Sequence, residues 1–160
     1  MARLALNQSS LTQQKRQLKT FQDYLPSLDL KRRQLVAEQS KARKTLQSNQ
    51  AKLAGIEAVV ATKMPMLGND SIELTHLVKL GNVRTREENI VGTRLPKLDR
   101  VDIVVRDYAL LGKPQWVDSL VEFLKAAVEL KVQILVASKR LELLDDAVRT
   151  ITQRVNLFDK

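Results

Sequence analysis

Apolar residues recur in an unbroken pattern along the C-terminal third of the chain. From Trp116 onward, positions that alternate in steps of four and three are all apolar. A repeat of about 3.5 residues held over about six heptads is typical of a helix that supercoils around a partner helix. The pattern therefore predicts a long coiled-coil helix over residues 115–160. Its seam positions are Trp116, Leu120, Phe123, Ala127, Leu130, Ile134, Ala137, Leu141, Leu144, Val148, Ile151, Val155 and Phe158.

The N-terminal third holds a looser version of the same repeat, which predicts a second helix over residues 10–63. Its apolar seam includes Leu18, Leu28, Leu35, Leu46 and Leu53. Eleven of its sixteen positions are apolar. The polar ones include Arg32, Gln39 and Asn49, and such residues cost stability but fix the register of the pairing.

One proline interrupts this N-terminal pattern. Pro26 removes a backbone donor and crowds the preceding helical turn, so we expect a kink near residues 23–26.

Residues 64–114 have a different character. β-Branched residues become frequent over residues 75–86 and 93–106, and residues 87–92 are rich in turn-forming types. This predicts a β-hairpin with its tip near residues 89–92. Two strands alone are only marginally stable in water, so the hairpin should lean on the helices or on a partner.

The two predicted seams should cover each other. Neither helix is stable with its seam exposed, and the middle segment is long enough to return the chain. The predicted fold is mainly α: a long antiparallel two-helix coiled-coil hairpin with a small central β-hairpin, one elongated domain over residues 1–160. Residue 63 should lie near residue 116, and residue 160 near residues 16–20. At about 1.5 Å per residue, the rod is roughly 65–80 Å long.

The residues that usually carry chemistry are scarce. The chain has no cysteine, one histidine (His76) and five scattered glycines. The acidic pairs at 87–88 and 145–146 are sequence neighbours, whose side chains point in different directions. We therefore expect no catalytic, cofactor or metal site.

The chain also has no long apolar run and no signal-peptide pattern, so we expect a cytoplasmic protein without membrane insertion. Trp116 is expected to pack in the core rather than on a partner.

The charge balance leaves several partners open. Lys and Arg number 27 against 18 Asp and Glu, a net charge of +9. This balance attracts nucleic acid, anionic lipid or an acidic protein, or it is only a solvated helix surface. A nucleic-acid-binding arm is disfavoured because the basic residues form no obvious single stripe and no aromatic residues are placed to stack on bases. A general scaffold or membrane adaptor remains another alternative, although the chain lacks a Lys-rich amphipathic helix with aromatic anchors.

Three segments resemble one known family. The Leu- and basic-rich run at residues 28–35, the stretch at residues 88–96 and the stretch at residues 153–158 are similar to motifs of the D subunit of V/A-type ATPases, in the same order. Asp29 and Gln153 depart from the family pattern, where Lys and Arg are common. Family members usually continue beyond the point at which this chain ends, which suggests a truncated chain.

The resemblance implies a non-catalytic rotor shaft. Such a subunit transmits torque between ATP hydrolysis or synthesis in a catalytic ring and ion translocation in the membrane, and it binds no nucleotide. The implied partners are the catalytic and regulatory ring subunits, a small globular stalk subunit and a funnel-shaped subunit that couples to the membrane rotor, with no nucleic acid. The subunit would be peripheral to the membrane. The candidate partner-binding residues are Glu87, Asn89, Ile90, Val91, Gly92 and Leu95 at the hairpin tip, with Lys31, Arg32, Arg33 and Arg154 in the helices.

Overall fold

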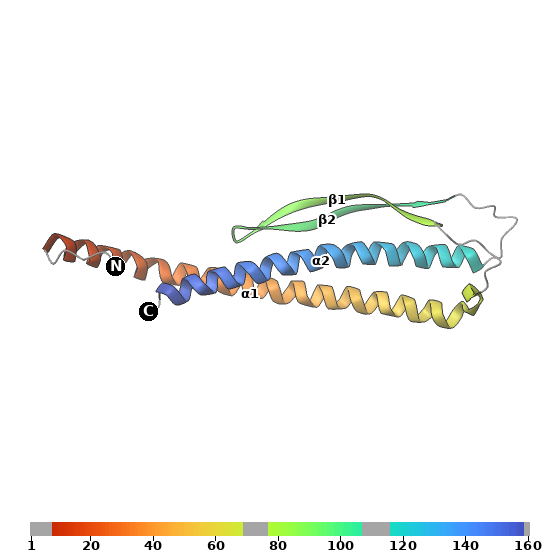
Figure 1. Ribbon diagram of the computed structural model, residues 1–160, viewed down its shortest axis with the longest axis horizontal. Coiled ribbons are helices and arrows are strands. Elements are labelled where there is room, and N and C mark those ends of the chain that lie inside the picture. The colour runs from red at the N-terminus through yellow and green to blue at the C-terminus, as the bar shows by residue number, and fades with distance from the viewer. Residues whose placement is uncertain (1–7, 69–76, 107–115, 159–160) are drawn as a thin grey trace.

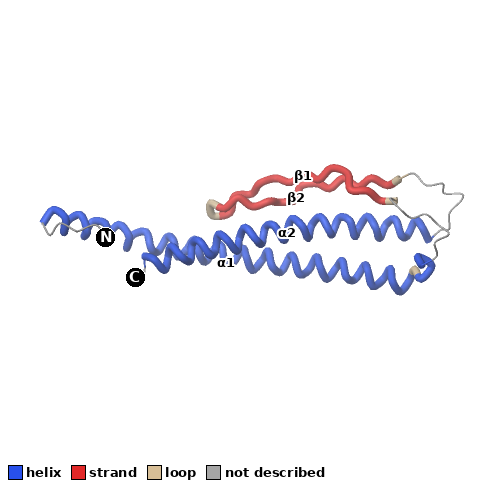
Figure 2. Tube along the Cα trace, in the orientation of Figure 1, coloured by secondary structure: helices blue, strands red, loops and turns tan. Residues whose placement is uncertain are grey.

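The computed structural model describes residues 8–68, 77–106 and 116–158. Two long helices lie side by side, and a two-stranded sheet runs along one of them (Figures 1 and 2). In chain order the elements are α1 (Gln8–Lys63), the short 3-10 helix η1 (Pro65–Gly68), β1 (Val78–Ile90), β2 (Thr93–Val105) and α2 (Trp116–Phe158). The predicted fold class is confirmed.

The predicted seam of α2 is buried or half-buried from Trp116 to Val155. Leu120, Ala137, Leu144, Ile151 and Val155 are buried. No other predicted seam side chain from Trp116 to Val155 is exposed. On α1 the same holds from Leu25 to Val60. The alternation of steps therefore identified the contact faces of both helices.

Two polar side chains lie in the interface between the helices. Gln39 Nε2 donates a hydrogen bond to Asp145 Oδ1 at 2.5 Å, between residues 106 positions apart in sequence. Asn49 is also buried. A shift of either helix would separate Gln39 from Asp145, so this pair supports the role of polar seam residues in fixing register.

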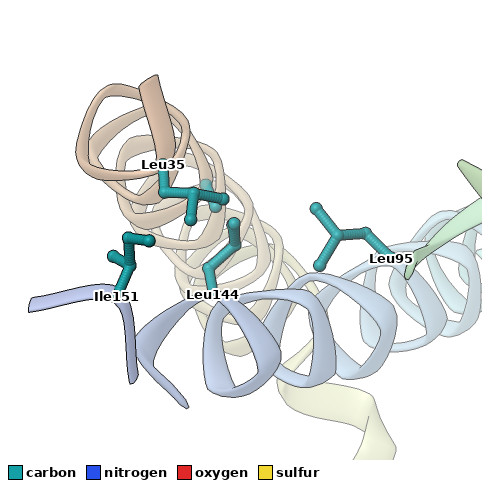
Figure 3. Close-up of a cluster of buried hydrophobic side chains, with 5 residues drawn as sticks. Leu35, Leu95, Leu144 and Ile151 are labelled. Carbon is teal, nitrogen blue, oxygen red and sulfur yellow. The ribbon is translucent and has the colours of Figure 1, made fainter. Parts of the chain in front are cut away.

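The β-hairpin packs along α2 rather than standing free (Figure 1). At its base, Leu77, Val117 and Val121 form a buried cluster, against which Trp116 packs. Near its tip, Leu95 joins a second cluster with Leu35, Ala42, Leu144 and Ile151. Figure 3 shows side chains from α1, β2 and α2 converging there. The hairpin thus leans on its own helices, and Trp116 packs in the core as predicted.

Several details differ from the sequence-based expectations. β1 continues to Ile90, so residues 87–90 belong to a strand, and only Val91 and Gly92 form the turn. Leu18 was predicted as a seam residue, but it is 58% exposed, because the part of α1 that holds it extends beyond the end of α2. Helix α1 runs through Pro26 without interruption, and a kink there stays a prediction. His76 and residue 160 lie outside the described residues.

Candidate interaction surfaces

The turn of the hairpin has an unusual backbone. Val91 and Gly92 both have positive φ angles, of 53° and 81°. A two-residue turn that joins twisted strands needs this conformation, but a β-branched valine is strained in it. Val91 also packs against the tip cluster of Leu35, Ala42, Leu95, Leu144 and Ile151. Apolar packing therefore holds the strained turn against the helices.

The tip separates into an inward and an outward side. Leu95 is fully buried, and Ile90 and Val91 pack partly buried against the tip cluster. These apolar residues could pack either on the coiled coil of their own chain or on a partner. In the structure they pack on their own coiled coil. In contrast, Glu87 and Arg94 have side chains that are 73% and 80% exposed. Asn89 and Gly92 are also exposed.

An ionic cluster fixes the tip to α2. Arg140 Nη1 donates to Glu88 Oε2 at 2.9 Å, and Lys97 Nζ lies 3.4 Å from Glu88 Oε1. Arg140 also reaches the carbonyl oxygen of Pro96 at 3.4 Å. The hydrogen bond from Arg140, followed by that from Lys97, lowers the pKa of the Glu88 carboxyl below its ordinary value. Sequence analysis missed Arg140, because nothing in the local pattern connects it to a carboxylate 52 residues away.

The basic candidates of the helices divide into two groups. A hollow of about 250 Å³ is lined by Lys31, Thr93 and Arg154, among others. Lys31 Nζ lies so close to the turn that a Cβ added at Gly92 would be 3.2 Å from it. Lys31, Thr93 and Arg154 therefore lie close together beside the hairpin turn, and their role in partner binding stays a prediction. Arg32 and Arg33 instead form ion pairs with Asp29, and Arg33 is 76% exposed.

The N-terminal part of α1 exposes apolar side chains beyond the paired region. Leu11, Leu18, Phe21 and Tyr24 are between 45% and 62% exposed, and Leu157 at the end of α2 is 74% exposed. A hollow of about 610 Å³ lies between the two helices here, lined by Phe21, Tyr24, Leu28 and Leu157 with several polar neighbours. A large exposed apolar surface of this kind marks an interaction site.

Two kinds of feature, a metal-binding cluster and a membrane-spanning helix, are not found among the described residues. Across residues 8–68, 77–106 and 116–158, no three His, Cys, Asp or Glu side chains are grouped to hold a metal ion. Within the same residues, no helix is both long and apolar enough to cross a membrane.

Comparison with known proteins assigns a family to this rod. The family model that describes the D subunit of ATP synthase matches residues 10–160. The chain belongs to the ATP synthase D-subunit family. One relative, named as the D subunit of V-type ATP synthase from Borreliella burgdorferi, is 28% identical over all of this chain and 79% of its own length. Relatives of the same name from Chlamydia muridarum and Chlamydia pneumoniae are 32% and 30% identical, over 79% and 75% of their lengths.

Membership of the ATP synthase D-subunit family confirms the resemblance drawn from the three motifs. It makes the chain a component of a V-type rotary ATPase, a machine of ATP synthesis and ion transport. The family match runs through both helices and the hairpin, so it covers every surface described above.

Proposed function

We propose that this chain is the central rotor shaft of its ATPase and transmits torque between the catalytic ring and the membrane sector. The observation that supports the proposal best is the pair of long helices, packed along one mainly apolar seam. Side chains interlocked along a seam resist sliding and twisting of one helix against the other, because protein interiors are close-packed. A pair of helices in a fixed register thus suits torque transmission better than one helix would.

The surface of the rod also suits rotation. Most ion pairs of the described residues are exposed, such as Lys139 with Glu142 and Lys125 with Glu122. Exposed ion pairs contribute only about 0–1 kcal/mol each, so pairs of this kind formed with the ring subunits would hold no single orientation of the shaft tightly. The apolar end of α1, with Leu11, Leu18 and Phe21, would then enter the ring of catalytic and regulatory subunits.

The opposite end of the rod carries the junction of α1, α2 and the hairpin base (Figure 1). We assign to this half the contacts with a small globular stalk subunit and with the funnel-shaped subunit of the membrane rotor. In this arrangement the chain is a non-catalytic subunit, peripheral to the membrane, and the ring performs the ATP chemistry.

Rotation of a probe on the hairpin tests the shaft proposal directly. The chain has no cysteine, so Arg100→Cys gives one attachment site on a hairpin side chain that is 70% exposed. The variant is assembled with the other subunits of its ATPase, the ring is fixed to glass, and a bead is attached at residue 100. With ATP the bead should rotate in one direction, and without ATP it should not. A bead that stays still in a complex that hydrolyses ATP would refute the proposal.

The hairpin tip is the second element of the proposal. Glu87, Asn89 and Arg94 point outward and would contact the stalk subunits, while Ile90, Val91 and Leu95 hold the tip on the coiled coil. Replacement of Glu87, Asn89 and Arg94 by alanine should reduce retention of stalk subunits without lowering the melting temperature of the isolated chain. Leu80→Ala, at a 49% exposed position far from the turn, is the control. Unchanged retention would exclude the outward side of the tip as a contact.

A further inference from the structure

The positive charge of this chain is concentrated on one helix. Helix α1 contains eleven Lys and Arg residues against four Asp and Glu. Helix α2 contains six of each kind and is neutral. Because the hairpin packs against α2, much of α1 is left facing solvent (Figure 1). With eleven basic and four acidic residues, α1 carries +7, the larger part of the net charge of +9.

Four of these cations share one face of α1. Arg33, Lys41, Lys44 and Lys52 follow one another at spacings of eight, three and eight residues, and all four are exposed. At about 100° per residue, these spacings keep them within about 100° of one another around the helix axis. The seam residues Leu35, Ala42 and Asn49 point the other way. We call these four residues the cationic face, and they qualify the expectation that no basic stripe exists.

Only part of the cationic face is compensated by carboxylates of the described residues. Arg33 and Lys41 form ion pairs with Asp29 and Glu38. No carboxylate occurs from Gln39 to Ile56. Among the described residues, neither Lys44 nor Lys52 has a carboxylate at ion-pair distance. Lys44 and Lys52, about 12 Å apart along the helix, therefore give this end of the face a positive potential.

The space between these cations is filled by small residues. Ala37, Ser48, Ala51 and Gly55 lie on the same side of the helix by spacing, and all are exposed. Gly55 stands inside a helix, where glycine is unfavourable, and a Cβ added there would meet nothing within 4 Å. Packing inside the chain therefore does not require glycine at position 55. Small residues allow another backbone to come close, between long basic side chains on either side.

We propose that the cationic face of α1 docks an acidic, elongated protein surface of another subunit of the same ATPase. The charge complementarity defines the partner: carboxylates spaced along a helix or strand that lies over the small exposed residues between Lys41, Lys44 and Lys52. The inference rests on the proposed function, because it takes the partner from the complex to which the shaft belongs. No aromatic side chain lies among the residues of this face, so it lacks the stacking groups of single-strand binders and the interfacial anchors of membrane helices.

Zero-length cross-linking of the assembled complex tests this assignment. A water-soluble carbodiimide joins a lysine amine to a carboxylate only when the two are in contact. In the full complex, mass spectrometry should find Lys44 and Lys52 joined to Asp or Glu of one neighbouring subunit. Lys131, exposed on α2 and without an ion pair among the described residues, is the matched lysine and should be joined far less often. Equal yields at the three lysines would overturn the proposal.

Charge reversal supplies a second, independent measurement. Lys44→Glu with Lys52→Glu should weaken retention of that subunit by about tenfold at low salt, and the difference should shrink as salt rises. Lys131→Glu with Arg149→Glu makes the same change in net charge on α2 and should leave retention unchanged. Gly55→Leu tests the close approach: it should weaken retention although the isolated chain melts no lower. If neither Lys44→Glu with Lys52→Glu nor Gly55→Leu weakens retention of the subunit, the docking proposal is refuted.

The outcomes separate this inference from the function on which it depends. If the unmodified chain fails to enter the ATPase complex, the proposed function is overturned. If it enters and the variants of the cationic face behave like the α2 control, only the docking face is overturned. A third outcome concerns other partners. The chain could bind a DNA duplex or phosphatidylserine vesicles, and Lys44→Glu with Lys52→Glu could abolish this binding while retention in the complex is unchanged. The partner of the cationic face would then be nucleic acid or membrane instead of protein.

Discussion

At the scale of single residues, a few leucines join all three parts of the molecule. Leu35 of α1, Leu95 of β2 and Leu144 of α2 are between 0% and 1% exposed and share one cluster. The sequence identified Leu35 and Leu144, because each occupies a seam position of a heptad pattern. It placed Leu95 only at the hairpin tip, since no periodicity tells which surface an apolar residue of a short hairpin will meet.

Leu144→Ala is expected to be strongly destabilising. The side chain is fully buried where α1, α2 and β2 meet, so its loss removes apolar contacts and leaves a cavity. We expect a fall of about 2–5 kcal/mol in the free energy of unfolding, measured by urea denaturation. Leu135→Ala, at a position of the same helix that is 70% exposed, should change it by less than about 0.5 kcal/mol. Equal losses would contradict the seam assignment.

The ionic cluster at Glu88 predicts a dependence of hairpin docking on pH. Its pKa is lowered in the folded chain by Arg140 and Lys97, so the charged carboxylate favours the docked state. This contribution is present above the ordinary glutamate pKa of about 4.3 and is lost as pH falls through the lowered value. Hydrogen exchange of the Leu95 amide should therefore accelerate, relative to that of the seam amides of α2, below about pH 4. In Glu88→Gln this additional acceleration should be absent.

At the scale of elements, the helices were predictable and the side of the rod that the hairpin covers was not. A 3.5-residue repeat over many heptads identifies a contact face without knowledge of the partner. The hairpin side depends on contacts such as Arg140 with Glu88 and Leu95 with Leu144, which join residues far apart in sequence. The turn itself was located to within two residues, although Val91 is a poor residue for a positive φ angle.

Two glycines in different elements should respond oppositely to alanine. Gly55 lies in α1 with open space around its Cα, so Gly55→Ala should raise the free energy of unfolding by about 1 kcal/mol through helix propensity. Gly81 lies in β1, where a Cβ would stand 2.9 Å from the carbonyl oxygen of Asp102. Gly81→Ala should therefore destabilise the chain. Thermal melts measure both effects: the melting temperature should rise in Gly55→Ala and fall in Gly81→Ala. Shifts of the same sign would contradict this prediction.

At the scale of the whole molecule, the chain is a rod whose functional surfaces follow from its asymmetry. The sequence predicted the two-helix pairing, because the pairing follows from the periodicity of apolar residues. It did not show that α2 carries the hairpin while α1 carries the charge, since charge counted over the whole chain hides its division between helices. The arrangement leaves α1 as the outward helix over the length covered by the cationic face.

A rotor shaft should turn as one body, which gives the last prediction. Gln39 and Asp145 form the polar contact between α1 and α2, and the chain has no other thiol to interfere. In Gln39→Cys with Asp145→Cys, a short bifunctional thiol reagent would join the two helices. If the helices do not move against each other during turnover, joining them adds no barrier. The joined chain should then support ATP-driven ion pumping within about twofold of the unjoined variant. An added barrier of about 1.4 kcal/mol would instead slow pumping tenfold. The unsubstituted chain treated with the same reagent controls for modification elsewhere in the complex. Strong inhibition that reverses when a cleavable reagent is cut would mean that the helices slide during each cycle, and the shaft would then transmit force by shear rather than as a rigid axle.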